Sequence, residues 1–334
     1  MLIKIKKNSA KIPAENLSEG IFQVDIPKLG KPIRGKVRDN WVINHKGIKK
    51  RIIITTDRQS AFVKTVCTIP KKGQISNLIS AYWFEQTKKI CPNHMIKAIH
   101  PNVLIAHQAK IKIPIEVILR RYIAKSTSPT SIYYNYFNRG RRKIYGINFP
   151  KDLKPNQELP MGTIITPTTK ATNGYDKELT DKKACKIVDN QFGKGTWDKI
   201  KSSAYKVFEK ARIECLSKGL ILADTKFEFG INERGNLMLI DEILTPECSR
   251  YWLLNKEKFN KKNLELDKDI IINWLRKKGF NGKGKIPKID KLIIKKMAKA
   301  YEIPYKMITR RKSPIQISNP NKINRAIMNY ISKK

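Results

Sequence analysis

Two apolar runs separated by a short polar loop stand out in the second half of the chain. They cover residues 220–231 and 237–244, and the Asn-Glu-Arg-Gly-Asn segment between them contains the glycine that hairpin loops favour. Side chains alternate along a strand, so Asp224, Lys226 and Glu228 share one face and the phenylalanines share the other. Charges gathered on one face are costly to cover with apolar packing, so we expect that face to meet water or a ligand.

The second run of this predicted hairpin is interrupted by Asp241 and Glu242. Magnesium accepts carboxylate oxygens, usually beside substrate phosphates, so Glu228 and Asp241 are candidate metal ligands. Both must then point to the same side, which requires Lys226 to lie opposite Asp241 across a four-residue loop, or a bulge that resets the register. The alternative is an exposed hairpin whose charges pair across the strands.

An antiparallel meander is predicted for the first third of the chain. Its strands are predicted by apolar, β-branched runs at residues 21–26, 41–43 and 51–56. Between the first two lies Gly35, which lets the backbone approach a ligand, with Lys36 and Arg38 supplying charge for nucleotide phosphates. Solvated lysines are the default alternative, because the segment lacks the spacing of a P-loop.

Polar clusters follow several predicted strands, where a sheet holds a loop rigidly enough to present ligand contacts. The first cluster, directly behind the last strand of the meander, contains Asp57, Arg58 and Ser60, for which a surface ion pair is the plain alternative. Arg120 and Ser126 follow a predicted strand at residues 113–119 and suit a phosphate or carboxylate. Further candidates are Lys170, Asp176 and Arg250.

Helical patterns occupy most of the remaining chain. Helices are predicted after a cap at Ser76, from Thr180, at residues 197–218, 269–277 and 291–307, and a basic tail follows Arg310.

The chain contains 69 lysines and arginines and 28 aspartates and glutamates, which gives a formal net charge of +41. The excess is spread along the whole chain together with many Ile and Asn residues and accompanies no nucleic-acid motif, so we expect no specific nucleic-acid partner. The five cysteines are odd in number and lack metal-site spacing, and no apolar run reaches membrane-spanning length. The start of the chain lacks an apolar signal region, so we expect a cytoplasmic protein.

All four histidines lie in the first third, far in sequence from the acidic hairpin, which argues against a Ser-His-Asp hydrolase. Lysines, arginines, carboxylates and a metal remain as candidate chemistry, and that set suits phosphoryl transfer.

Seven motifs in order resemble the SAICAR synthetase (phosphoribosylaminoimidazole-succinocarboxamide synthase) family. They read GKVRD, TTDRQSAF, PKKGQ, EVILRRYIAKSTS, TPTTK, LADTKFEFG and LIDEILTPECSRYW. The resemblance implies a purine-biosynthesis ligase that joins the carboxylated aminoimidazole ribonucleotide CAIR and L-aspartate, with ATP and Mg²⁺, to give SAICAR, ADP and phosphate through an acyl phosphate. It also implies a two-lobed α+β fold with an antiparallel N-terminal lobe, a second α+β lobe and C-terminal helices, and ATP between the lobes.

The resemblance assigns roles residue by residue. It implies Lys226 and Asp224 as catalytic residues, Glu228 and Asp241 as metal ligands, and Gly35, Lys36 and Arg38 as the nucleotide-phosphate loop. The implied substrate contacts are Arg120, Ser126, Arg250, Ser249, Asp57, Arg58, Ser60, Lys170 and Asp176.

Several positions depart from the family pattern. Val63 and Glu247 each replace an aspartate, Arg121 and Lys125 each replace a glycine, and Tyr175 replaces a histidine. Two alternatives to the implied ligase therefore stay open: a related ATP-dependent phosphotransferase or ligase with a changed substrate, and an inactive basic binding protein.

The predicted organisation is a nucleotide-binding lobe over residues 1–112, a substrate and metal lobe over 113–310, and a basic tail over 311–334. A monomer or small homo-oligomer is expected.

Overall fold

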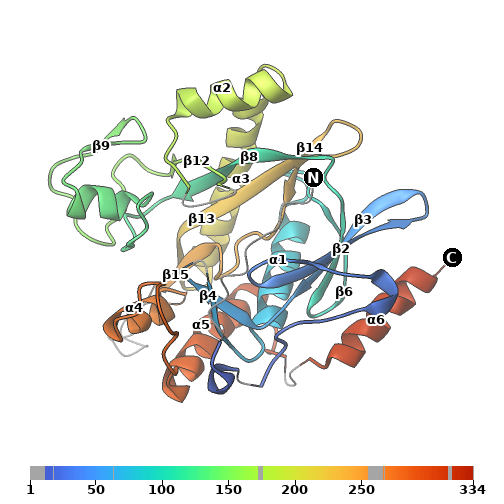
Figure 1. The fold of residues 1–334 in the computed structure, drawn as a ribbon. Coiled ribbons are helices and arrows are strands. Elements are labelled where there is room, and N and C mark those ends of the chain that lie inside the picture. The colour runs from blue at the N-terminus through green and yellow to red at the C-terminus, as the bar shows by residue number, and fades with distance from the viewer. Residues whose placement is uncertain are drawn as a thin grey trace.

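The computed structural model describes residues 12–17, 19–62, 64–171, 176–254, 266, 268–314 and 318–333. Two main antiparallel sheets and a set of helices make up the chain, as Figure 1 shows. The predicted α+β class, with antiparallel strands in the N-terminal part and helices at the C-terminal end, is confirmed. The predicted division into two lobes and a tail at residues 112 and 310 stays a prediction.

The N-terminal sheet has the strand order β1-β2-β3-β7-β6. Its strands are β1 (Ile33–Arg34), β2 (Arg38–His45), β3 (Ile48–Thr55), β6 (Met95–His100) and β7 (Val103–His107). A separate ribbon joins β4 (Arg58–Ala61) to β5 (Lys64–Thr68). The β2–β3 turn is made by Lys46 and Gly47, both with positive φ, which matches the twist of a two-residue hairpin.

The strand predicted at residues 21–26 is not formed, although Ile21, Val24 and Ile26 are buried in the core of this sheet. Carboxylates take the place of a partner strand: the amide of Ile21 donates to Asp57 Oδ2 at 2.8 Å and that of Val24 to Asp39 Oδ2 at 2.9 Å. The apolar pattern therefore predicted the burial correctly, whereas side chains satisfy the backbone groups that a ladder would pair.

The second sheet is organised around β13 (Leu220–Ile231), the first predicted strand of the hairpin. Its other strands are β8 (Ile111–Arg120), β11 (Ile164–Ile165), β12 (Thr168–Thr169), β14 (Leu237–Ile240) and β15 (Ser249–Leu253). β13 pairs with β8 along one edge and with β14 and β15 along the other. A small extension carries a π-helical turn (Tyr134–Asn138), β9 (Lys143–Ile144) and β10 (Ile147–Asn148).

Helices pack against these sheets and complete the core (Figure 1). They are α1 (Lys72–Thr87), α2 (Asp181–Phe192), α3 (Thr196–Ser217), α4 (Asp269–Lys277) and α5 (Lys291–Thr309), and short 3-10 turns lie at Ala14–Asn16 and Pro27–Leu29. Buried side chains of α1, α3, α5 and both sheets form one continuous apolar cluster. α1 begins four residues before the predicted cap at Ser76, because Asp57 Oδ1 accepts the amide of Gly73 at 2.8 Å and starts the helix earlier.

The predicted basic tail contains a helix, α6 (Pro320–Ser332), which begins at an Asn319 cap. Its residues Ile323 and Ile327 are both fully buried and pack into the same cluster as Trp41 and Ile52 of the N-terminal sheet. The tail therefore covers an apolar face of that sheet.

This packing predicts a stability effect. Ile327→Ala is expected to lower the free energy of unfolding by about 2 to 5 kcal/mol, because a buried side chain is lost and a cavity remains. The exposed Asn329→Ala on the same helix is the matched control and should leave it within about 0.5 kcal/mol. Urea unfolding followed by circular dichroism measures both, and equal losses in the two variants would contradict the docked position of α6.

Candidate active site

A cavity of about 260 Å³ opens between β8, β13 and the N-terminal end of α4. Its lining combines many charged and hydroxyl groups: Glu116, Ile118, Arg120, Ser126, Ser128, Thr130, Ser131, Asp176, Asp224, Thr225, Lys226, Pro246, Glu247, Cys248, Ser249, Arg250, Lys268 and Asp269. A pocket near this size that is lined by charges of both signs suits a small polar ligand.

A row of ion pairs crosses three strands at one end of this cavity. Asp224 on β13 lies in register with Arg120 on β8 and with Arg250 on β15, so all three side chains share a face. Asp224 Oδ2 lies 2.6 Å from Arg250 and 3.4 Å from Arg120, and Arg250 Nε lies 3.2 Å from Asp269. Asp224 is only 3% exposed, so its carboxylate orients the two arginines, which face the cavity.

Lys226 lies two residues further along the same face of β13. Its Nζ is 2.6 Å from Glu116 on β8 and 3.8 Å from Glu228, and Glu228 also pairs with Lys170. Burial opposes the effect, but Glu116 and Glu228 raise the pKa of Lys226 above its ordinary value. Lys226 is therefore a permanent cation at neutral pH and supplies charge, with no free amine to act as a nucleophile.

The side chain of Asp241 does not have the orientation that alternation along a continued β14 strand would give. The hairpin loop has five residues, Asn232–Asn236, and the register pairs Glu228 with Ile240, so a continued strand would place Asp241 opposite Phe227. The expected four-residue loop with Lys226 opposite Asp241 is wrong. Instead, β14 ends at Ile240 and Asp241 adopts a left-handed φ of 73°, which turns its side chain out of the strand pattern.

The surroundings of Asp241 place it beside the other charged groups. Arg38 lies 2.6 Å from its carboxylate. Burial would raise the pKa of Asp241, yet the charges of Arg38, Lys226 and Lys170 lower it well below its ordinary value. Because Lys226 and Lys170 are also the partners of Glu228, the two acids share one electrostatic neighbourhood.

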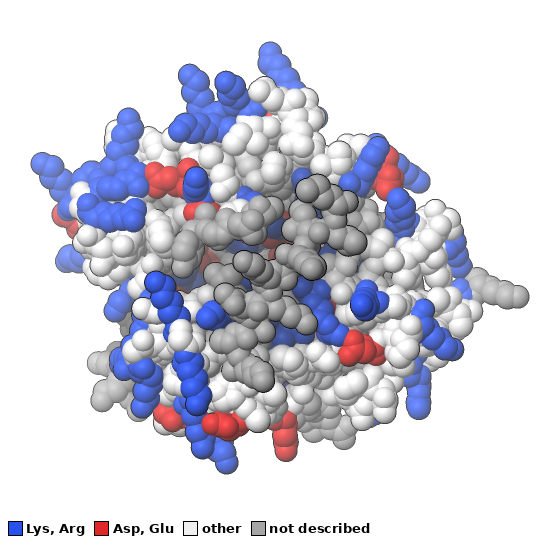
Figure 2. Space-filling view, in the orientation of Figure 1, with Lys and Arg blue, Asp and Glu red and all other residues white. Residues whose placement is uncertain are grey.

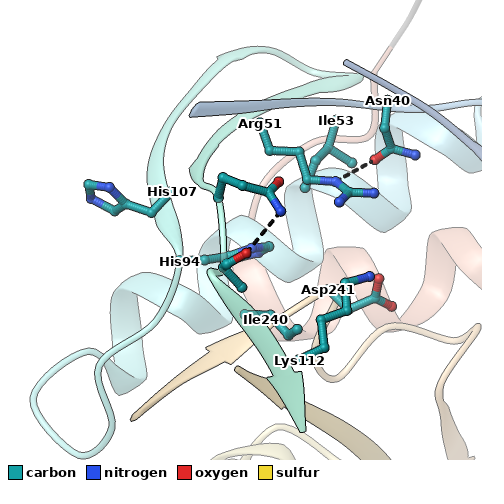
Figure 3. Close-up of a pocket in the computed structure, with 10 residues that line it drawn as sticks. Asn40, Arg51, Ile53, His94, His107, Lys112, Ile240 and Asp241 are labelled. Atoms are coloured by element: carbon teal, nitrogen blue, oxygen red, sulfur yellow. Dashed lines mark hydrogen bonds between the residues drawn. The ribbon is translucent and has the colours of Figure 1, made fainter. Parts of the chain in front are cut away.

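A second, smaller cavity of about 20 Å³ lies at Asp241 on the side of the N-terminal sheet. Figure 3 shows Arg51 and Asn40 entering it from that sheet and Lys112, Ile240 and Asp241 from the other, with His94 at its floor. The Nε2 atom of His94 and the Oε1 atom of Gln108 are buried and make no hydrogen bond within the described part of the chain. The space suits one water molecule with polar partners.

Glu228 and Asp241 suit Mg²⁺ as two carboxylate ligands that act together with oxygen atoms of a substrate. Across the described ranges no group of three or more His, Cys, Asp or Glu side chains forms a metal site. Two carboxylates that bind together with substrate phosphates are how proteins commonly hold Mg²⁺, so Glu228 and Asp241 would hold the ion jointly with a nucleotide. Three cations already pair with these two acids, Arg38 with Asp241, and Lys170 and Lys226 with Glu228.

Two of the predicted substrate contacts are used inside the protein. Asp57 is 1% exposed and accepts the amides of Ile21 and Gly73, while Arg58 is 5% exposed and donates to the carbonyl oxygens of Lys36, Phe22 and Gly35. The structure gives both a positioning role: Arg58 holds the Gly35 loop and Asp57 starts α1. Ser60 lies half-buried on β4, outside the cavity lining.

The remaining predicted residues lie at or near the cavity. Ser126 and Asp176 line it directly, and Ser249 does so while its hydroxyl contacts that of Thr225 at 2.7 Å. Desolvation and the nearby charges of Lys268 and Lys226 lower the pKa of Lys36, and Arg38, at the end of the same loop, contacts Asp241.

Of the described positions that depart from the family pattern, Arg121 and Lys125 lie outside the cavity lining and Glu247 belongs to it. Arg121 pairs with the exposed Glu158 at 2.5 Å, and Lys125 is exposed with its amide on Asn156. Neither has a positive φ, so the backbone conformation at these positions does not require glycine. Val63 and Tyr175 lie outside the described residues.

Several lining residues were not identified from the sequence. Lys268 and Asp269 sit at the start of the predicted helix 269–277, but nothing local indicated that this helix end meets β15. Arg51 begins the predicted strand 51–56 and Lys112 directly precedes the predicted strand 113–119, and both have the pattern of ordinary surface charges. Glu116 is an acid inside an apolar strand, and that signal could have identified it.

Comparison with known proteins bears directly on this site. The family model of SAICAR synthetase matches residues 31–289, which include β2, β8, β13, β14 and α4. The chain belongs to the SAICAR synthetase family.

Individual members of the SAICAR synthetase family agree with this assignment. A phosphoribosylaminoimidazole-succinocarboxamide synthase of Legionella pneumophila is 38% identical over 309 residues, covering 91% of this chain and 95% of the relative. The SAICAR synthase of Saccharomyces cerevisiae solved in complex with SAICAR has a TM-score of 0.71 at 28% identity, covering 87% of this chain and 99% of that one. A SAICAR synthetase solved in complex with ADP shares the fold, with a TM-score of 0.62, 22% identity and coverage of 85% and 100%.

Proposed function

We propose that this protein is a phosphoribosylaminoimidazole-succinocarboxamide synthase, which joins CAIR and L-aspartate at the expense of ATP to give SAICAR, ADP and phosphate. The observation that carries the proposal is the row of Arg120, Asp224 and Arg250 across three strands, next to Lys226 and the acid pair Glu228 and Asp241. One end of this face suits a phosphate monoester and the other suits a nucleotide triphosphate, as a ligase of this kind requires.

The chemistry assigns a task to each group. A carboxylate resists attack by an amine until one of its oxygens becomes a leaving group, and transfer of the ATP γ-phosphoryl group to the CAIR carboxylate achieves this. The aspartate amine then attacks the acyl carbon, and phosphate leaves. We assign Arg120, Arg250 and Ser126 to the phosphate of CAIR, because they line the cavity at the end away from Asp241. Lys226 neutralises charge that develops on the transferred group.

The nucleotide and metal assignments extend the proposal. Lys36 and Arg38 would contact nucleotide phosphates, and Arg51 and Lys112 add two cations at the smaller cavity. Glu228 and Asp241 would hold Mg²⁺, which neutralises phosphate charge when bound. Lys170, as the partner of Glu228, and Asp176, at the cavity wall, are assigned to the aspartate side of the site.

The face of the molecule seen in Figure 2 gives no support to a specific polyanion partner. Figure 2 shows lysine and arginine side chains spread around the whole rim of this face, without a single continuous stripe. The described helices include none long and apolar enough to cross a membrane. A cytoplasmic location and a monomer or small homo-oligomer remain part of the proposal.

The ligase reaction has a direct test in its substrate requirements. Phosphate release from ATP and Mg²⁺ should require both CAIR and L-aspartate and stop when either is omitted. ATP binding without release in any combination would point to a changed substrate, and the absence of ATP binding would point to an inactive relative.

A pH effect is expected from Glu116. Burial raises the pKa of Glu116 above its ordinary value of 4.5, against the opposing charge of Lys226. As the pH falls, Glu116 therefore takes up a proton sooner than an ordinary glutamate and stops pairing with Lys226. The acid limb of kcat/KM should lie above pH 4.5, and Glu116→Gln should abolish that limb.

Rate profiles over about pH 5 to 9 measure this effect. The exposed Glu158→Gln, whose partner Arg121 lies outside the cavity, is the matched control and should keep the wild-type limb. A limb that persists in Glu116→Gln would contradict the assignment.

A further inference from the structure

Glu247, one of the positions that depart from the family pattern, stands in the cavity wall with one oxygen already engaged. Its Oε1 lies 3.0 Å from Lys72 Nζ and also accepts the hydroxyl of Tyr301. Both contacts are made to the same oxygen, and the described part of the chain shows no partner for Oε2 of this cavity-lining residue. A carboxylate held in this manner has a fixed direction for its second oxygen.

Lys72 is fully buried, which is rare for a lysine, and Glu247 is its carboxylate partner. Its Nζ also donates to the carbonyl oxygen of Arg58 at 2.9 Å and lies 5.5 Å from the centre of the Tyr301 ring. A buried ammonium group is costly unless it is paired, so Lys72 holds Glu247 strongly. Lys72 does not line the cavity itself, and Glu247 is the cavity-lining residue that it contacts.

Tyr301 comes from α5, beyond the residues 31–289 that the family model matches. It is fully buried, and α5 packs along α1, the helix that begins with Lys72. The two groups that fix Glu247 therefore come from helices on the far side of the cavity wall.

We infer that Tyr301 and Lys72 are positioning residues, which fix Oε1 of Glu247 so that Oε2 accepts a hydrogen bond from an N–H or O–H group of the substrate in the cavity. The inference rests on the proposed function, since it takes the cavity as the CAIR site. It links α5, through Tyr301, to the substrate site.

Tyr301→Phe tests this inference with little change in packing, because only the hydroxyl is removed. The KM for CAIR should rise about tenfold, as expected when a charged group loses a hydrogen bond that orients it, while kcat and the KM for ATP stay within about twofold. Tyr305→Phe, one turn further along α5 at another buried tyrosine outside the cavity lining, is the matched control and should leave all three constants unchanged.

A second variant shows whether the effect passes through Glu247. Glu247→Gln keeps the shape of the side chain and should itself raise the KM for CAIR. Adding Tyr301→Phe to it should then change that KM by less than about twofold, since groups that act through one contact are not additive.

Three results would overturn the inference. The first is an unchanged KM for CAIR in Tyr301→Phe. The second is an additive effect on that KM in the double variant. The third is a parallel change of all three kinetic constants and of Tm in both tyrosine variants. If the wild type turned over no CAIR, the proposed function itself would fail and the inference with it. Wild-type activity with an unaffected Tyr301→Phe would refute the inference alone.

Discussion

Asp241→Asn is expected to lower the rate of SAICAR formation by at least about 10³-fold without unfolding the chain. The substitution keeps the shape of the side chain but removes the charge that Arg38 contacts at 2.6 Å and that Mg²⁺ would need. Asp241 also holds a left-handed φ of 73°, which asparagine tolerates better than most residues, so the backbone should survive the change. Turnover gives the rate, and binding of Mn²⁺ with ATP, followed by electron paramagnetic resonance, gives a readout independent of catalysis.

Glu233→Gln is the matched control for this experiment. It removes an acid from the exposed loop of the same hairpin, so rate and metal binding should both stay at the wild-type level. If Asp241→Asn kept its activity, or lost activity while binding the metal and ATP normally, Asp241 would not be a metal ligand.

Lys226→Met should lower kcat by about 10²-fold, with a smaller effect on the KM for ATP. The reason is electrostatic: Lys226 lies 2.6 Å from Glu116 and 3.8 Å from Glu228, and its loss leaves two acids without their shared cation. Glu116 and Glu228 raise the pKa of Lys226, against burial, so its charge does not titrate near neutral pH. The loss in kcat should therefore be the same at every pH between about 6 and 9.

Lys226→Arg separates charge from shape, because arginine keeps the charge but not the compact ammonium group. Partial activity in this variant, together with the near-complete loss in Lys226→Met, would support an electrostatic role. The exposed Lys110→Met on the adjoining segment is the control and should have no effect. A loss that appears only at high pH would contradict a permanent cation and indicate an amine that must lose its proton.

Local patterns in the sequence were sufficient to predict much of the fold. The strand at 220–231 and the helix at 269–277 have the bounds that their periodicities predict, because burial of one face governs both. The segment 21–26 shows the limit of this approach: its apolar pattern predicts burial, but which groups satisfy its backbone depends on Asp39 and Asp57, which are distant in sequence.

The candidate site was predictable where alternation along one strand decides the face, as for Asp224, Lys226 and Glu228. It was not predictable at Asp241, where a backbone turn replaces the expected register. Asp57 and Arg58 carry the charges typical of ligand contacts, yet Asp57 accepts backbone amides, and Arg58 donates to backbone carbonyl oxygens and to the Asp39 carboxylate. Tyr301 and Lys72 reach Glu247 only through the packing of α1 on α5, which no pattern within a single element can indicate.

The most direct test of the proposed ligase uses CAIR labelled with ¹⁸O in its carboxylate, incubated with ATP, Mg²⁺ and L-aspartate. If the carboxylate is phosphorylated and then attacked by the aspartate amine, one labelled oxygen leaves with the phosphate. Mass spectrometry should therefore find one ¹⁸O in each released phosphate and SAICAR in equal amount. Release of unlabelled phosphate, or SAICAR formation without ATP cleavage, would contradict the acyl-phosphate route and the ligase function assigned to this site.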